Sequence, residues 1–380
     1  MANTSCNQKA RELLDQCLRG EPWDRELLGQ LLRDGCDEAL FRIVAEGLSD
    51  RFEPRLCRVY DEIFSQVLGV QIQKAETRLT DFRRVFVLSR VTLGADVAVT
   101  SIILDAVKQR FPKAEIYLAG PLKNAELFAT DERIRHLPVT YRRGTISDRT
   151  AHIPELRKAV DHPDALVIDP DSRLTQLGLL PVCRPENYLF FESRSYGVDS
   201  DESLVQLTTR WCGEVLGVDA QPYIAIPPAG PLPRPSIAVS LGVGDNPAKR
   251  LPDPFESNLL RSLPGHITID AGAGGEEAER VIRATVGMNV RFCRGSFAEF
   301  AAVIQASDFY IGYDSAGQHV AAACSIPQVS IFAGEPCERM FQRWRPTGEG
   351  KICILRANSQ AKMDLISLCL LHIVSSCSSL

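Results

Sequence analysis

Two runs of alternating strand-like and helix-like segments, separated by a proline-rich stretch, constrain the fold of this chain most strongly. Residues 84–89 and 236–240 are β-branched and apolar, as buried parallel strands are, and each begins a series in which amphipathic helical segments follow. Further strand-like runs lie at 114–119, 165–169, 266–270, 290–293, 308–311 and 328–332. Residues 221–235 hold six of the 23 prolines, which is typical of a linker. The pattern predicts an α/β chain with two doubly wound domains facing a cleft.

The first 80 residues follow a different pattern. Leucines recur there at helical spacing, as at 27, 28, 31 and 32, and a longer helix is predicted over 54–70. A last helix is predicted over 358–374, crossing back toward the first domain. The predicted division is a helical extension (1–80), two α/β domains (81–230 and 231–356) and a C-terminal helix (357–380).

Composition excludes several classes of protein. The chain is 45% hydrophobic and 24% charged, which is typical of a globular protein and not of a disordered or collagen-like chain. Its formal net charge of −5 gives no basic excess, so no nucleic-acid partner is expected. The 12 cysteines form no C-x-x-C pair, and no apolar stretch approaches the ~20 residues of a membrane span. We therefore expect a cytoplasmic protein with reduced cysteines and no structural metal.

The segment that begins at Asp314 carries the most chemical information. A predicted strand delivers Asp314 to its end, and Ser315, Ala316 and Gly317 then open a helix of small residues. The free N–H groups and the dipole of such a helix start can bind a diphosphate, and His319 can donate to a phosphate or a ribose. A helix cap formed by Asp314 and Ser315 is the alternative interpretation.

This segment resembles the signature of glycosyltransferase family 9, the ADP-heptose:lipopolysaccharide heptosyltransferases. The usual pattern there is D-[ST]-G-x-x-H-x-A-A-A followed by P and F-G, and Asp314, Ser315, His319, Ala321 to Ala323, Pro327 and Phe332 match it. Residues 93–112 resemble the block S-L-G-D-x-x-L-T…L-K-x-x-F-P, residues 242–252 resemble G-x-x-x-x-x-K-R-W-P, and residues 343–348 resemble W-R-P-x-G. Three positions depart from the family: Ala95 and Ala316 replace glycine, and Leu251 replaces tryptophan.

The resemblance implies the GT-B fold, in which two Rossmann-like domains face a cleft and the second holds the nucleotide-sugar donor, here an ADP-sugar. It implies an inverting, metal-independent transfer of a sugar, a heptose, to a hydroxyl of a glycan, lipid-linked glycan or protein acceptor in lipopolysaccharide biosynthesis, without a cofactor. Asp96 would be the general base and Lys249 would neutralise the departing diphosphate. The implied donor site comprises Lys249, Arg250, Asp314, Ser315, Ala316, Gly317 and His319. A helix cap is the alternative for Asp96, and a solvated pair is the alternative for Lys249 and Arg250.

Other features bear on partners and on rival functions. Arginines 133, 135, 142, 143 and 149 lie close in sequence and suggest a patch for an anionic acceptor or for peripheral contact with the inner membrane, with solvated surface arginines as the alternative. The sequence Asp169-Pro-Asp171 is interpreted as a chance D-x-D rather than a metal site. Residues 1–80 are a candidate oligomerisation segment. A GT-B nucleotide-sugar epimerase and a catalytically decayed scaffold are the rival functions.

Overall fold

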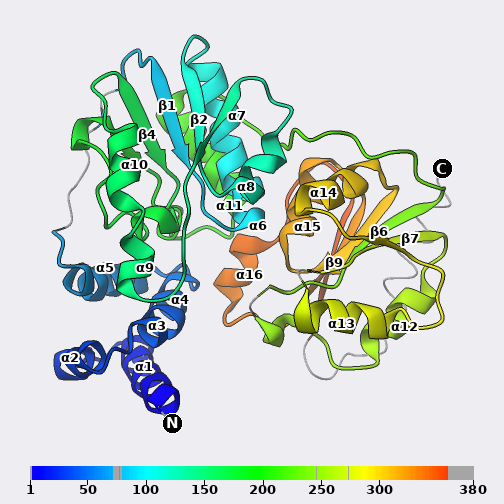
Figure 1. Cartoon of the computed structure of the whole chain (residues 1–380), viewed down its shortest axis with the longest axis horizontal. Helices are drawn as coiled ribbons and strands as arrows, with labels where there is room; N and C mark the ends of the chain where they lie inside the picture. The colour runs from blue at the N-terminus through cyan, green and yellow to red at the C-terminus, as the bar shows by residue number, and fades with distance from the viewer. Residues whose placement is uncertain (1, 72–76, 78, 245, 273, 358–380) are drawn as a thin grey trace.

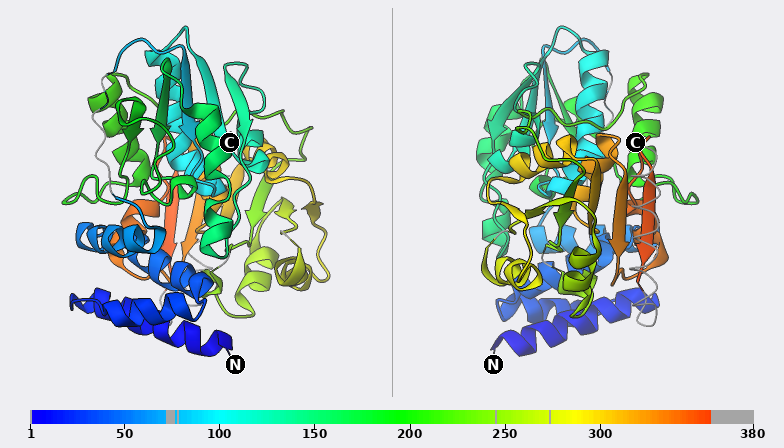
Figure 2. Two further views of the ribbon diagram at one scale, coloured as in Figure 1. Left: turned by 60° about the vertical axis from the view of Figure 1, so that its left-hand side comes forward. Right: turned by 90° about the vertical axis from the view of Figure 1, so that its right-hand side faces the viewer.

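A computed structural model describes residues 2–71, 77, 79–244, 246–272 and 274–357. Two parallel β-sheets, each flanked by helices, lie beside one another, and the N-terminal helices gather at one end of the molecule (Figure 1, Figure 2). The α/β fold class predicted from the sequence is confirmed. The predicted C-terminal helix lies outside the described residues, and the predicted domain bounds stay a prediction.

The N-terminal segment is helical, as its leucine spacing predicted. Its elements are α1 (Ala2–Arg19), α2 (Arg25–Arg33), α3 (Asp37–Ala39), a π-helical turn (Leu40–Ala45), α4 (Glu46–Ser49) and α5 (Pro54–Leu68). Asp24 caps α2 by accepting from the N–H groups of Glu26 and Leu27, and Gly69 ends α5 in the left-handed conformation that favours glycine. Leu177 and Leu179, from the first α/β unit, belong to the apolar core of this segment. The extension is therefore packed onto the first sheet's loops.

The cysteines need one correction. Cys6 and Cys36 form a disulfide, because α1 and the start of α3 bring their Cα atoms to 5.4 Å, so the expectation of uniformly reduced cysteines is wrong. Four others, at positions 17, 57, 183 and 212, are buried as small apolar side chains. Within the described residues, no helix is long and apolar enough to cross a membrane.

The first sheet has the strand order β3-β2-β1-β4-β5, and all its pairs are parallel. Its strands are β1 (Arg84–Leu88), β2 (Glu115–Gly120), β3 (Ile134–Pro138), β4 (Ala165–Asp169) and β5 (Tyr188–Phe190). Its helices are α6 (Leu93–Ala95), a π-helical turn (Asp96–Thr100), α7 (Ser101–Arg110), α8 (Leu122–Ala125), α9 (Ile146–Thr150), α10 (Ile153–Val160) and α11 (Leu204–Leu216). Alternate residues of β1 enter the two core clusters on opposite faces, Val85 and Val87 in one, Phe86 and Leu88 in the other. Burial on both faces explains why this strand reads as a continuous apolar run.

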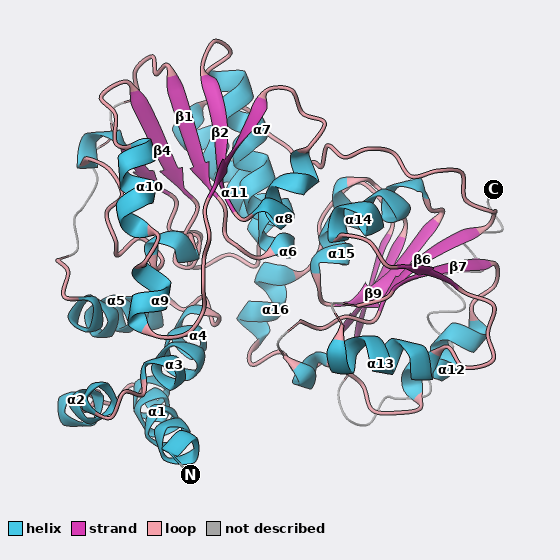
Figure 3. Cartoon of the chain, viewed as in Figure 1, coloured by secondary structure: helices cyan, strands magenta, loops and turns pink. Residues whose placement is uncertain are grey.

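The second sheet repeats the plan with one more strand, in the order β11-β10-β9-β6-β7-β8 (Figure 3). Its strands are β6 (Ser236–Ser240), β7 (His266–Asp270), β8 (Arg291–Cys293), β9 (Phe309–Tyr313), β10 (Gln328–Phe332) and β11 (Ile352–Arg356). Its helices are α12 (Phe255–Ser262), α13 (Gly275–Ala284), α14 (Phe297–Ala306), α15 (Ala316–Ala323) and α16 (Glu338–Trp344). Strand order reverses between β1 and β4 and between β6 and β9, and ligands of such sheets bind beyond the carboxyl ends of the strands at these points.

The two α/β units contact each other directly. α6 of the first unit lies against α15 of the second, and one apolar cluster contains residues of both α7 and α14. Arg343, on α16, is buried and donates from Nη1 to the carbonyls of Ser200 (2.8 Å) and Glu202 (2.5 Å) and from Nη2 to that of Gly197 (2.7 Å). This arginine fastens the second unit to a loop of the first.

Replacing Arg343 with methionine should therefore destabilise the chain. Arg343→Met leaves three carbonyls without their donor, and we expect the free energy of unfolding to fall by about 3 kcal/mol. Arg345→Met is the matched control, because Arg345 makes one exposed bond to the carbonyl of Asp201, and it should cost less than about 1 kcal/mol. Urea unfolding followed by circular dichroism measures both, and equal losses in the two variants would contradict the role given to Arg343.

Candidate active site

Lys249 and Asp314 meet at the point where strand order reverses in the second sheet. Lys249 lies in the loop after β6, and Asp314 directly follows β9. The Lys249 Nζ lies 2.6 Å from Asp314 Oδ2 and 3.4 Å from the Asp314 carbonyl, and both side chains are mostly buried. The structure thus brings together two residues 65 positions apart that the motifs had assigned to one site.

The first turn of α15 adjoins this pair. Ser315 is extended, with φ −154°, and its side chain makes no cap hydrogen bond, so the first N–H groups of the helix are left for another acceptor. Gly317 is required by packing, since a Cβ there would lie 2.2 Å from the hydroxyl of Tyr310. Ala316 faces α6, where a Cβ on Gly94 would lie 3.2 Å from the Ala316 Cα. The segment of the first unit that contains Gly94 therefore contacts the start of α15 in the second unit.

Gln318 is a site residue that the sequence analysis missed. Its Nε2 donates to Asp314 Oδ1 (2.7 Å) and to the Trp344 carbonyl (3.3 Å), so it fixes the carboxylate that holds Lys249. The sequence offered little signal for it, because Asp314 precedes the extended cap Ser315 and Gln318 lies in the first turn of α15.

His319 is buried beside the Trp344 ring, with ring centroids 5.9 Å apart. Burial lowers its pKa to about 4, so the imidazole is neutral near pH 7. Its Nδ1 has no hydrogen-bond partner among the described residues. A neutral imidazole with a free ring nitrogen can donate to or accept from a ligand.

Arg250 contacts elements other than α15. Its Nη2 donates to the carbonyl of Leu241 (3.1 Å), and its guanidinium lies 3.8 Å from Glu256 and 3.9 Å from Glu277. Glu256 is almost fully buried and needs cationic partners to offset its desolvation. Arg250 therefore lies toward α12 and α13 rather than α15, and its assignment as a donor-binding residue stays a prediction.

Asp96 also differs from expectation. It is fully buried, and its carboxylate accepts four hydrogen bonds, from Ser89 Oγ (2.5 Å), the Arg90 N–H (2.7 Å), Thr100 Oγ1 (2.5 Å) and Asn124 Nδ2 (2.6 Å). A carboxylate offers about four lone-pair sites, so none is left for an acceptor hydroxyl. Burial raises the pKa of Asp96, and these hydrogen bonds oppose that effect. The residue holds the loop after β1 in place, and this arrangement does not fit the predicted general base.

The D-x-D sequence and the arginine patch have structural contacts. Asp169 accepts from Thr175 and Tyr188, and both carboxylate oxygens of Asp171 accept from the single donor Arg194 Nε. No group of three potential ligands that could hold a metal ion occurs in the described ranges. Arg149 is buried over the Phe41 ring and Arg135 pairs with Glu115, so the predicted patch does not form one continuous anionic-ligand surface.

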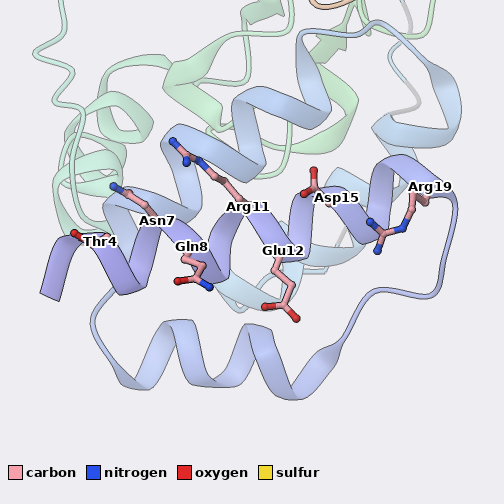
Figure 4. Close-up of a pocket in the computed structure, with 7 residues that line it drawn as sticks. All are labelled: Thr4, Asn7, Gln8, Arg11, Glu12, Asp15 and Arg19. Atoms are coloured by element: carbon pink, nitrogen blue, oxygen red, sulfur yellow. The ribbon is translucent and has the colours of Figure 1, made fainter. Parts of the chain in front are cut away.

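A hollow of about 630 Å³ lies away from this site. It runs along one face of α1 (Figure 4) and is lined by polar side chains of that helix alone, namely Thr4, Asn7, Gln8, Arg11, Glu12, Asp15 and Arg19. Ligand sites combine enclosure with polar groups that converge from several elements, and this surface has no such convergence.

Comparisons with known proteins give one family match and several similar folds. Residues 259–372 match the family model described as glycosyltransferase family 9 (heptosyltransferase). No curated protein sequence matches the chain. A family 9 glycosyl transferase from Veillonella parvula is similar in structure at 16% identity with a TM-score of 0.56, covering 80% of this chain and 98% of that one. E. coli heptosyltransferase WaaC with ADP (17%, TM-score 0.54, 76% and 99% covered) and E. coli ADP-heptose LPS heptosyltransferase II (18%, TM-score 0.55, 77% and 98% covered) are similar too.

The fold and the site define the class of protein as a glycosyltransferase with the GT-B fold. Within that class, residues 259–372 match glycosyltransferase family 9, the heptosyltransferases. The recognition made from three motifs is confirmed, and the family match covers the second sheet's Asp314 to His319 segment.

The buried His319 should make stability depend on pH in a defined direction. A histidine whose pKa is about 4 when folded and about 6.5 when unfolded binds protons more readily in the unfolded chain, so its contribution to stability declines as pH falls from about 6.5 toward 4. We expect wild type to lose about 3 kcal/mol more than His319→Gln over this interval. Urea unfolding at pH 7, 6, 5 and 4.5 tests this, and parallel losses in both proteins would show that His319 does not titrate as its burial requires.

Proposed function

We propose that this chain transfers a sugar, a heptose, from an ADP-sugar donor to a hydroxyl of a glycan, a lipid-linked glycan or a protein, with inversion and without a metal ion. The observation that carries the proposal is the Lys249–Asp314 ion pair beside the first turn of α15. In support, an E. coli WaaC structure that contains ADP-2-deoxy-2-fluoro heptose is similar at 17% identity with a TM-score of 0.56, covering 76% of this chain and 99% of that one.

The charges at this point suit a departing diphosphate. As the bond from the anomeric carbon to the diphosphate breaks, negative charge grows on the leaving oxygen. Lys249 supplies a full positive charge, and the first N–H groups of α15 supply hydrogen bonds and the positive end of the helix dipole. Asp314 and Gln318 fix the position of the Lys249 ammonium, so that this stabilisation is in place before the reaction.

The position of the first unit suits an in-line displacement. α6 and the loop after β1 lie against the start of α15, on the side opposite the second sheet. An acceptor hydroxyl held by the first unit can therefore approach the anomeric carbon from the face opposite the diphosphate, which gives inversion. Asp96 acts here as a positioning residue, since its four hydrogen bonds set the course of residues 89–96.

Titration with nucleotides tests the donor site. We expect ADP to bind wild type with micromolar affinity and Lys249→Gln at least about tenfold more weakly, because a charge-assisted contact to phosphate is lost. Arg250→Gln is the matched control, since Arg250 contacts α12 and α13, and its ADP affinity should equal that of wild type. Isothermal calorimetry with ADP, UDP and GDP measures this. Absence of binding by all three would favour the decayed scaffold instead.

Substitution of Asp96 separates positioning from proton transfer. Asp96→Asn places an N–H₂ group where donors converge, and we expect the free energy of unfolding to fall by about 3 kcal/mol while ADP affinity is unchanged. Asp105→Asn on α7 is the control, because its partly exposed carboxylate accepts only two hydrogen bonds in the described residues, from Gln109 Nε2 and the Gln221 N–H, and its loss should cost less. If Asp96→Asn were as stable as wild type but had lost transfer with a verified donor and acceptor, the general-base role would be restored.

A further inference from the structure

A buried tyrosine lies against the first turn of α15. Tyr310 belongs to the central strand β9, its side chain is fully buried, and it packs in the apolar cluster that the two α/β units share. Its hydroxyl has no hydrogen-bond partner within the described residues. Buried hydroxyls are nearly always hydrogen-bonded, so an unpartnered one at the base of a candidate site requires a physical reason.

Two glycines surround the Tyr310 hydroxyl. A Cβ on Gly312, in β9, would lie 2.8 Å from the ring carbon that bears the hydroxyl, and a Cβ on Gly317, in the first turn of α15, would lie 2.7 Å from the same carbon. Both distances are shorter than real Cβ contacts, and the buried ring has no room to move aside. The hydroxyl is thus held between the end of the strand and the start of the helix.

The same contact accounts for a departure of this chain from the pattern D-[ST]-G-x-x-H. The glycine of that pattern falls on position 316, where this chain has alanine, and a variable position falls on 317, where it has glycine. Since the Tyr310 hydroxyl occupies the space of a side chain at 317, the tyrosine sets the requirement for Gly317. The turn of this chain is therefore built around a hydroxyl group.

A second unpartnered hydroxyl adjoins the first. Ser315 makes no cap hydrogen bond, and its Oγ is buried without a partner in the described part of the chain. Burial raises the pKa of Tyr310, and Ser315 is among the side chains near enough to the phenol to oppose that rise. The phenol is therefore a neutral O–H donor near pH 7. Two neighbouring buried hydroxyls that both lack a partner fit a set of hydrogen bonds that a ligand completes.

We propose that Tyr310 is a positioning residue for the donor, which donates to Ser315 Oγ so that the Ser315 hydroxyl donates to an oxygen of the donor's diphosphate. A hydroxyl can accept one hydrogen bond while it donates another, and an ionised phosphate oxygen only accepts, so the direction of both bonds is fixed. Because the Tyr310 ring is fully buried, it orients the Ser315 hydroxyl before the bond to the sugar breaks. The inference rests on the proposed function, since its ligand is the diphosphate at the start of α15.

Stability without nucleotide gives the first test, measured by scanning calorimetry on the full chain. Tyr310→Phe removes a hydroxyl that has no partner among the described residues, so we expect its melting temperature to equal or exceed that of wild type. Tyr60→Phe is the matched control, because Tyr60 is also buried but donates to the Gln176 carbonyl, and it should melt at a lower temperature. A clear loss of stability in Tyr310→Phe would mean that its hydroxyl serves the fold, and it would overturn the proposal.

Nucleotide binding, measured by isothermal calorimetry, gives the second test. We expect ADP to bind Tyr310→Phe and Ser315→Ala about fivefold more weakly than wild type. Because both substitutions break the same chain of hydrogen bonds, the double variant should also lose about fivefold, and not the roughly 25-fold of two independent losses. Adenosine, which lacks the diphosphate, should bind every variant as it binds wild type, as measured by its competition with ADP. Tyr60→Phe should bind ADP as wild type does.

Three binding results would overturn the role given to Tyr310. They are wild-type ADP affinity in Tyr310→Phe, equal weakening of ADP and adenosine, and losses that multiply in the double variant. Failure of the proposed function is recognised separately. Absence of ADP binding to wild type would remove both proposals, whereas weakened binding in Lys249→Gln together with wild-type affinity in Tyr310→Phe would remove the role of Tyr310 alone.

Discussion

The buried carboxylate of Asp96 is the interaction on which both halves of the site depend. Its four hydrogen bonds come from β1's loop, from the following helical turn and from α8, so they fix the path of residues 89–96. That path carries Arg90 to the Pro170 carbonyl and Ser193 and Gly94 to the start of α15. The buried Asp96 carboxylate, with all four of its hydrogen bonds made, thus positions the first α/β unit relative to the start of α15 in the second. Leaving any of these bonds unmade would cost more than the bond contributes, which favours a single loop conformation.

The donor side uses charge differently. Lys249 and Asp314 form an ion pair that is mostly but not fully buried, and Gln318 restrains it on one side only. A cation held by a single carboxylate can exchange part of that contact for a phosphate oxygen without becoming buried and unpaired. Arg250, next in sequence, instead donates to the Leu241 carbonyl and lies near Glu256 and Glu277 on α12 and α13. Two adjacent cations therefore face different elements, Lys249 the start of α15 and Arg250 the helices α12 and α13.

The difference between local patterns and tertiary contacts explains how much of the fold and of the site could be predicted from the sequence. Local patterns correctly predicted the central strands and the helical extension, because burial on both faces of β1 or β6 imposes a continuous apolar run. The edge strands β3, β5 and β11 were missed: each is only partly buried, β5 has three residues, and β3 carries Arg135 and His136. Lys249 and Asp314 were paired through motifs whose spacing follows from the fold. The partners of Asp96, Arg250 and Arg149 could not be predicted, because Asn124, Glu256 and Phe41 reach them only through tertiary packing.

The N-terminal extension then has a physical role that the shared fold does not require. The similar solved structures are covered over 98–99% of their length by only 76–80% of this chain, and the excess is about the size of residues 1–80. Those residues are packed on the loop after β4, where Tyr60 donates to the Gln176 carbonyl, and Phe52 meets Trp344 of α16. Gln176 and Phe52 both have positive φ, so the extension packs against strained backbone beside the loop after β4. The extension thus restrains the loops of the first sheet near the point where its strand order reverses, and the second sheet is contacted through Phe52 and Trp344.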